Sequence, residues 1–186
     1  AFWVVAGGIG GEINCTGLRK DSCQGDKEIV PIMERFGAQV GWQENAVKAS
    51  SGKLKGIDID AAQIPDLVPI LCTAAALAEG KTLIYNAGRL RIKESDRLKA
   101  MAEGLQRLGV SVTQQPDSIL IEGGNVMPSE EVVLDSYDDH RIVMALAVAA
   151  AALGVEAVIE RAEAVSKSYP TFFAEFTRLG GAADVF

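Results

Sequence analysis

The sequence is poor in the residues that build metal sites and disulfide frameworks. Among its 186 residues it has one histidine and three cysteines, and Cys15, Cys23 and Cys72 form no Cys-X-X-Cys pair. An odd number of cysteines does not indicate a disulfide framework, and a single histidine gives a zinc ion no close set of ligands. We therefore expect no structural zinc site, and a reducing, cytoplasmic setting for the chain.

Long apolar runs and an excess of positive charge are missing as well. The longest apolar stretch, residues 142–153, is shorter than the roughly 20 residues of a membrane-spanning helix, so we expect a buried helix there. The 18 lysines and arginines are outnumbered by 25 aspartates and glutamates, which gives a net charge of -7. This balance argues against broad binding to nucleic acid or to an anionic membrane. Any anion site must then be a local concentration of cations.

The first residues lack the marks of a natural start. There is no initiator methionine and no signal peptide, and residues 1–6 have the composition of the inside of an apolar helix with nothing before it as a cap. We therefore expect the chain to be a piece of a longer protein. Its 48% apolar content is enough to build a core.

What the sequence does contain is an internal repeat. The ending Arg-Φ-Gly, where Φ is apolar, occurs at Arg35-Phe-Gly37, Arg107-Leu-Gly109 and Arg178-Leu-Gly180, so its glycines are 72 and 71 residues apart. Each glycine follows the last apolar position of a helical pattern, where a left-handed residue is favoured. We expect three copies, near residues 1–56, 57–129 and 130–186, within a single domain.

The repeat predicts an α/β fold of βαβαββ-type units in which sheets surround buried parallel helices. Residues 1–8, 67–79 and 142–153 are apolar almost all round and should lie buried together, whereas the helices with polar faces should cover the outside. Asp66 is well placed as a helix N-cap. We expect strands near residues 11–15, 38–43, 46–50, 57–59, 82–85, 110–114, 119–122, 131–134 and 157–160, and a closing strand near Asp184.

The most charged stretch of the chain is Arg89-Leu-Arg-Ile-Lys-Glu-Ser-Asp-Arg97, with four cations and two carboxylates directly before a helical pattern. One interpretation is an anion pocket, in which Lys93 and Arg97 add to the unpaired amides of a helix N-terminus. The other is a solvated helix start, in which Glu94 and Asp96 complement the helix dipole and Arg97 pairs along the helix.

Three further charged loops also precede helices, and matched loops of a repeat tend to emerge on one face. Taken singly, each has a structural explanation. Asp66, Asp138 and Asp139 could be N-caps, His140 could bond to a carbonyl, and Lys167 could be plain surface. Together they would hold an anion while carboxylates move protons. The full set is Lys93, Arg97, Arg141 and Lys167 around Asp66, Glu94 and His140.

These loops resemble the motifs of the 5-enolpyruvylshikimate-3-phosphate synthase family, in order and at similar spacing. The segments that carry the resemblance are Ile64-Pro-Asp66, Arg91-Ile-Lys-Glu-Ser-Asp-Arg-Leu98, Tyr137-Asp-Asp-His-Arg141 and Ser166-Lys-Ser-Tyr-Pro170, and the loop Asp21-Ser-Cys-Gln-Gly-Asp26 fits too. The resemblance covers the whole chain but only the C-terminal part of the family, roughly one domain of its two-domain fold.

The resemblance implies transfer of the enolpyruvyl group of phosphoenolpyruvate to the 5-hydroxyl of shikimate 3-phosphate, with loss of phosphate and without a metal or organic cofactor. This reaction belongs to the shikimate pathway of aromatic amino acid biosynthesis. The family's remaining contacts, including an essential lysine and a Ser-Ser-Gln phosphate cradle, lie in a part that would precede Ala1. The expected partner is therefore the missing N-terminal domain, and we expect this chain alone to be inactive.

Roles for single residues follow from the same resemblance. Asp66 corresponds to the base on the 5-hydroxyl and Glu94 to the carboxylate beside the enol methylene, with Lys93 near both substrates and His140 in the same site. The cations that hold phosphoenolpyruvate, and at which glyphosate would compete, correspond to Arg97, Arg141 and Lys167. Arg89 stands where one branch of the family has an asparagine that contacts shikimate 3-phosphate.

Two alternatives remain open at this point. The sister enzyme that transfers enolpyruvyl to UDP-N-acetylglucosamine shares the repeat architecture. A non-catalytic repeat module that binds an anionic partner through the loop face would also use these cations.

Overall fold

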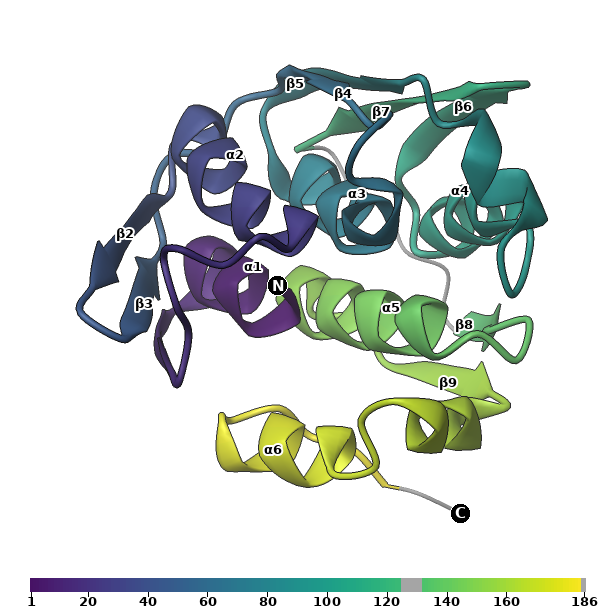
Figure 1. Cartoon of the computed structure of the whole chain (residues 1–186). Helices are drawn as coiled ribbons and strands as arrows, with labels where there is room; N and C mark the ends of the chain where they lie inside the picture. Colours follow the sequence, from purple (N-terminus) through teal and green to yellow (C-terminus); the bar gives the residue numbers. More distant parts are fainter. Residues whose placement is uncertain (125–131, 185–186) are drawn as a thin grey trace.

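A computed structural model describes residues 1–124 and 132–184 of the chain. Three apolar helices pack against one another in the centre, and small sheets and the remaining helices lie around them (Figure 1). The central helices are α1 (Phe2–Gly10), α3 (Val68–Leu77) and α5 (His140–Leu153). This arrangement confirms the predicted α/β fold, in which sheets surround buried helices.

The apolar character of the central helices explains their position. Residues 68–76 of α3 and 142–150 of α5 are buried without a break, as their composition predicts. A buried polar bond joins the two helices, because the Thr73 hydroxyl donates to the Ala145 carbonyl at 2.9 Å. α1 is buried on one face only, and its other face, with Trp3, stays partly exposed. Among the described residues, no helix is both long and apolar enough to cross a membrane.

The first sheet is a three-stranded antiparallel sheet with the strand order β1-β3-β2. The predicted hairpin of β2 and β3 is confirmed, and Glu44 in its turn has a positive φ of 48°. A helix packs on this sheet and follows directly on a 3-10 turn. The elements are β1 (Glu12–Thr16), η1 (Gly25–Glu28), α2 (Ile29–Phe36), β2 (Gln39–Gln43) and β3 (Ala46–Ser50).

The other two sheets are built on βαβ units. β4 continues through α3 to its parallel neighbour β5, and β8 continues through α5 to its parallel neighbour β9. The hairpin of β6 and β7 extends the second sheet in the order β4-β5-β7-β6. The bounds are β4 (Asp58–Asp60), β5 (Gly80–Tyr85), α4 (Arg97–Arg107), β6 (Ser111–Gln115), β7 (Ser118–Gly123), β8 (Val132–Asp135), β9 (Ala157–Glu160) and α6 (Phe172–Arg178).

The helix ends follow the repeat. Gly37, Gly109 and Gly180 have φ angles of 106°, 88° and 99°, which confirms the predicted left-handed residue after each Arg-Φ pair. The predicted closing strand near Asp184 is wrong, because residues 181–184 pair with no neighbouring strand. Glu131, which was predicted to begin the eighth strand, lies outside the described residues, as does the predicted boundary between the second and third copies.

Candidate active site

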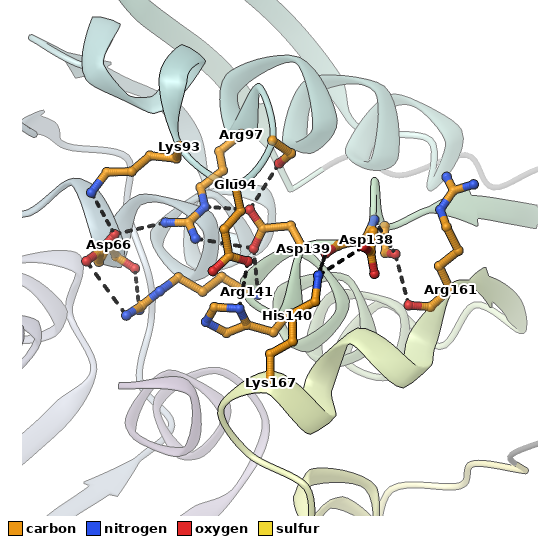
Figure 2. Close-up of polar contacts among 12 residues, drawn as sticks. Asp66, Lys93, Glu94, Arg97, Asp138, Asp139, His140, Arg141, Arg161 and Lys167 are labelled. Carbon is orange, nitrogen blue, oxygen red and sulfur yellow. Dashed lines mark hydrogen bonds and ion pairs between the residues drawn. The ribbon is translucent and has the colours of Figure 1, made fainter.

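Charged side chains from loops far apart in the sequence meet at the N-terminal ends of the helices (Figure 2). Asp66 lies in the 3-10 turn η2 (Pro65–Leu67) before α3, and Arg97 is the first residue of α4. His140 and Arg141 are the first two residues of α5, and Lys167 ends the turn η4 (Ala162–Lys167) before α6. Each of these loops precedes a helix in its copy of the repeat, and the loops therefore lie on the same face of the molecule.

Asp66 is the centre of the cation cluster, which we define as Lys93, Arg97 and Arg141. Its carboxylate lies 2.9 Å from Arg97 Nη1, 3.4 Å from Lys93 Nζ and 3.7 Å from Arg141 Nη2. Arg141 Nη1 also donates to the Asp66 carbonyl at 3.0 Å. Burial alone would raise the pKa of Asp66, but the charges of Arg141, Lys93 and Arg97 outweigh burial and hold it below its ordinary value.

The prediction that Asp66 caps α3 is wrong. The cap position is Leu67, and no side chain bonds to the free amides of this helix end. The reason is that η2 runs straight into α3, so Asp66 precedes the cap position and its carboxylate points to the cations instead. Asp66 therefore serves the site and not the helix.

Arg97 is the most deeply buried member of the cluster, and a fully buried carboxylate holds it in place. Arg97 is 3% exposed and Asp139 is 0% exposed, and Arg97 Nε and Nη2 donate to the Asp139 carboxylate at 2.7 and 3.3 Å. The Ser95 hydroxyl and the Arg141 backbone amide donate to the same carboxylate at 3.0 and 2.9 Å. Burial opposes the charge of Asp139, but the bonds and charge of Arg97 prevail and lower its pKa.

These contacts decide between the two interpretations of the charged stretch. A solvated helix start is wrong, because Arg97 is buried and pairs across to other loops, not along its own helix. At the α4 N-terminus, Asp96 is the cap: it accepts from the Lys99 amide at 3.0 Å and pairs with Arg91 at 2.8 Å. The candidate anion site therefore rests on the side chains that meet at Asp66, and α4 begins at Arg97, directly after this cap.

A carboxylate and an imidazole form a second pair beside the cluster. His140 Nδ1 lies 2.9 Å from a Glu94 carboxylate oxygen. His140 is buried, whereas the Glu94 side chain is 44% exposed. The imidazole is therefore shielded from solvent, and the carboxylate is in contact with it. The interpretation that His140 bonds to a carbonyl is therefore wrong for this ring nitrogen, because its partner is a carboxylate. Such a pair can hold a proton at the surface of the site.

Two predicted site residues stand apart from the cluster. Lys167 donates to the Asp138 carbonyl at 2.6 Å and lies 3.0 Å from the Asp138 carboxylate, so it joins the site through the residue next to Asp139. Arg89 lies exposed in the 3-10 turn η3 (Gly88–Ile92), and within the described part of the chain its side chain forms no hydrogen bond or ion pair. The structure brings the other six predicted residues together.

Glu94, Asp139 and His140 also have the side-chain chemistry of a metal site, since their ligand atoms lie within 4.8 Å of one another. Both oxygens of Asp139, however, already accept hydrogen bonds, from Arg97, Ser95 and the Arg141 amide. A metal ion would have to displace the buried Arg97. The geometry therefore favours a hydrogen-bonded network over a metal centre.

Sequence reasoning missed the roles of Ser95 and Asp139. Both residues were visible in the motifs, and Asp139 was correctly predicted as a possible helix cap. Its burial against a guanidinium 42 residues away was not visible, because neither residue type nor spacing reports which loops touch. The one available signal was the repeat, which predicts that equivalent loops lie together.

Comparison with known proteins agrees with this constellation. The family model described as EPSP synthase (3-phosphoshikimate 1-carboxyvinyltransferase) matches residues 1–176. The 3-phosphoshikimate 1-carboxyvinyltransferase of Clostridium acetobutylicum is 49% identical over 181 residues, which cover 97% of this chain and 41% of that protein. The enzyme of the same name from Clostridium kluyveri is 45% identical over 184 residues, 99% of this chain and 43% of that protein. The chain thus spans less than half the length of these curated relatives.

Solved structures give the same result. An EPSP synthase from Acinetobacter baumannii superposes with a TM-score of 0.81 at 29% identity, over 97% of this chain and 45% of that chain. The enolpyruvyl transferase NikO from Streptomyces tendae has a TM-score of 0.77 over 97% of this chain and 42% of its own, and at 21% identity this likeness concerns the fold alone. Since the family model matches almost the whole chain, the chain belongs to the EPSP synthase family.

Proposed function

We propose that this chain supplies one wall of the active site of a 3-phosphoshikimate 1-carboxyvinyltransferase. The enzyme transfers the enolpyruvyl group of phosphoenolpyruvate to the 5-hydroxyl of shikimate 3-phosphate, a step toward the aromatic amino acids. One observation carries the proposal: three cations meet at Asp66 beside the pair of Glu94 and His140, in a chain of the EPSP synthase family.

The proposed reaction needs two proton transfers and a site for an anion. In the addition step, the hydroxyl oxygen bonds to C2 of the enol, its proton passes to a base, and the methylene carbon gains a proton and becomes a methyl group. In the elimination step, the methyl group returns a proton, the bond from C2 to the phosphate oxygen breaks, and phosphate leaves. No electrons are exchanged, so the proposed reaction needs no redox cofactor, and the family resemblance implies neither a metal nor an organic cofactor.

The cation cluster suits the phosphate and carboxylate groups of phosphoenolpyruvate. Lys93 and Arg141 are 29% and 22% exposed, so their charged ends are within reach of a ligand, and Arg97 lies beneath them. Guanidinium groups match planar carboxylates and phosphates with two parallel hydrogen bonds. We assign Arg97, Arg141 and Lys167 to phosphoenolpyruvate, where glyphosate would compete, and Lys93 to both substrates. Arg89 is the candidate contact to shikimate 3-phosphate.

Asp66 is the proposed base on the 5-hydroxyl. Its pKa is held low while the three cations face it, and it is then a weak base. An incoming phosphate or carboxylate would share these cations, which raises the pKa of Asp66. The carboxylate therefore becomes a stronger base once the enol substrate is bound.

Glu94 and His140 are the proposed carriers of the proton on the enol methylene. The exposed end of Glu94 is free to meet a ligand, while its other contact, with His140 Nδ1, lies in the buried part of the site. In the elimination step the methyl group returns a proton to this pair, so the pair regains the proton that it gives in the addition step. Lys93, one residue before Glu94, directs its positive charge to Asp66, 3.4 Å from that carboxylate.

The opposite wall of the site is proposed to come from an N-terminal domain of the same enzyme. The relatives are more than twice as long as the part that this chain matches. The side chains of Glu94 and Lys167 are 44% and 46% exposed, so solvent reaches this charged face in the described part of the chain. In this proposal residues 1–186 are one domain with three copies, near 1–56, 57–129 and 130–186, which works in the cytoplasm and does not turn over alone.

Phosphate release by the full-length protein that contains this chain tests the proposal. Phosphoenolpyruvate with shikimate 3-phosphate should release phosphate, and phosphoenolpyruvate with UDP-N-acetylglucosamine should not. Release with the UDP-sugar alone would favour the sister enzyme. No release with either acceptor, together with heparin binding that weakens steeply with salt, would favour a non-catalytic anion-binding module.

A further inference from the structure

Asp139 does more than cap α5. A helix cap needs one acceptor oxygen at the helix end, and it works at the surface, as Asp96 does at 34% exposure before α4. Asp139 caps α5 through the Arg141 amide but is completely buried and also receives Arg97 twice and Ser95 once. These additional donors come from a loop 42 to 44 residues away in the sequence.

The loop that carries Asp139 has an unusual backbone. Tyr137 and Asp138 both have positive φ angles, 54° and 56°, although neither is glycine. Side chains hold this shape, because the Asp135 carboxylate accepts from the Tyr137 amide at 2.6 Å and the Ser136 hydroxyl accepts from the Asp138 amide at 3.2 Å. Two consecutive residues in a rarely adopted conformation directly precede Asp139. Such segments persist where surrounding contacts determine them.

We infer that Asp139, with Ser95, is a positioning residue that fixes the guanidinium of Arg97 for the enol substrate. Asp139 takes Arg97 Nε and Nη2, so Nη1 is the edge left to face Asp66 and a bound anion. A guanidinium is planar, and fixing two of its nitrogens fixes the direction of the third. Figure 2 shows this order, with Arg97 between Asp139 and Asp66. The inference rests on the proposed function and adds a residue that contacts no substrate.

A double-mutant cycle in the full-length enzyme tests the inference. Asp139→Asn should raise KM for phosphoenolpyruvate on the order of 10- to 100-fold, since a displaced contact costs up to about 100-fold, and should leave KM for shikimate 3-phosphate within about twofold. Arg97→Lys should have a similar effect, because lysine cannot be held at two points. KM for phosphoenolpyruvate in the double variant should be about equal to that of the single variant with the higher KM, because both changes disturb the same contact.

The matched control is Asp96→Asn, the same substitution at the cap of α4, whose partners are Lys99 and Arg91. It should leave KM for phosphoenolpyruvate unchanged. Losses from Asp139→Asn and Arg97→Lys that multiply, or a loss from Asp139→Asn that falls equally on both substrates, would overturn the positioning role. If Asp139→Asn does not fold, Ser95→Ala takes its place in the cycle, with a several-fold loss that disappears beside Arg97→Lys. A Ser95→Ala enzyme with unchanged KM would then overturn the inference.

Failure of the proposed function is recognised separately. The unmodified enzyme reports whether phosphate is released at all, whereas the cycle compares four proteins with one another. If no phosphate is released, calorimetric titration measures the dissociation constant of inorganic phosphate for the same four proteins. The double-mutant cycle is then calculated from these constants, and no turnover is needed. Non-additive losses of phosphate affinity would support the positioning of Arg97, and multiplying losses would contradict it.

Discussion

In the proposed mechanism Asp66 has two tasks that place opposite demands on its pKa. In the free chain it balances three cations, and this contact keeps the pKa of the carboxylate below its ordinary value against the effect of burial. As a base it needs a higher pKa. In the proposal, the enol substrate would take over part of the contact with the cations, which would satisfy both demands in sequence. Asp66 would then be an effective base only when the substrate is present.

The two carboxylates among the proposed proton carriers give the first prediction. Asp66→Asn and Glu94→Gln in the full-length enzyme should each lower kcat about 100-fold or more, with a change in KM of no more than a few-fold, because each removes a proton carrier and keeps the shape. Steady-state phosphate release measures both constants. In heavy water, Glu94→Gln should also slow the incorporation of deuterium into the enol methylene of the product.

Surface carboxylates provide the controls. Glu122 is 45% exposed, close to the 44% of Glu94, and pairs only with Lys81 among the described residues. Glu122→Gln should therefore keep the wild-type kcat. Near-normal kcat in Asp66→Asn and Glu94→Gln would remove both residues from the proposed mechanism.

The buried pair of Asp139 and Arg97 gives a prediction for stability against pH. Because the pKa of Asp139 is lowered on folding, the unfolded chain binds its proton more readily. The stabilisation is therefore complete above the ordinary value of about 3.9 and is lost as the pH falls below it. Asp139→Asn should cost about 3 kcal/mol at pH 7, since it removes the buried one of the two carboxylates that pair with Arg97, and should flatten the loss of stability below about pH 4.

Denaturant unfolding at pH 7, 4 and 3 measures this effect. Asp117→Asn is the control, because Asp117 is exposed and forms no ion pair among the described residues. It should keep the wild-type dependence on pH. A loss of stability in Asp139→Asn that is just as steep below pH 4 would show that another carboxylate is responsible.

At the scale of the elements, a close backbone contact between the strand β7 and the central helix α3 sets the position of the second sheet on this helix. A Cβ atom on Gly123, at the end of β7, would lie 2.3, 2.5 and 2.7 Å from the carbonyl oxygens of Ala75, Ala78 and Ala76. These carbonyls belong to the last turn of α3 and the residue after it. Only glycine allows β7 to approach α3 this closely.

Gly123→Ala should therefore lower the free energy of unfolding by about 1–3 kcal/mol, the usual cost of overpacking. Denaturant melts of the wild type and the variant measure the difference. Gly41→Ala in β2 is the matched control, because no atom would lie within 4 Å of its new Cβ, and its effect should stay within about 0.5 kcal/mol. Equal stability of Gly123→Ala and the wild type would mean that α3 and β7 are free to separate.

The elements were largely predictable from the sequence, whereas the partners of the charged residues were not. Apolar composition is a local signal, and it predicted the burial of α3 and α5. The cap of α5 was predicted because Asp139 directly precedes the helix. The same rule gave a wrong prediction for Asp66. Its carboxylate pairs with Arg97, 31 residues away, and this contact outweighs the local preference of aspartate for a helix cap. A contact between loops depends on how helices are arranged in space, and sequence spacing reports it only through the repeat.

At the scale of the whole molecule, the described part of the chain presents a charged face, which the proposal makes one wall of the active site. The cation cluster, the pair of Glu94 and His140, and Lys167 all lie at the helix N-terminal ends on this face (Figure 2). Electrostatic groups act most strongly where water is excluded. An open face gives weak binding and slow chemistry, so the proposed activity requires a second domain to close over it.

The most direct test compares phosphate release by the 186-residue chain with release by the full-length protein that contains it, given phosphoenolpyruvate and shikimate 3-phosphate. We predict sustained release by the full-length protein, its loss in the Glu94→Gln variant, and no release by the 186-residue chain alone. Turnover by the chain alone, or a full-length protein that releases phosphate equally well with Glu94→Gln, would contradict the account of this face as one wall of a shared active site.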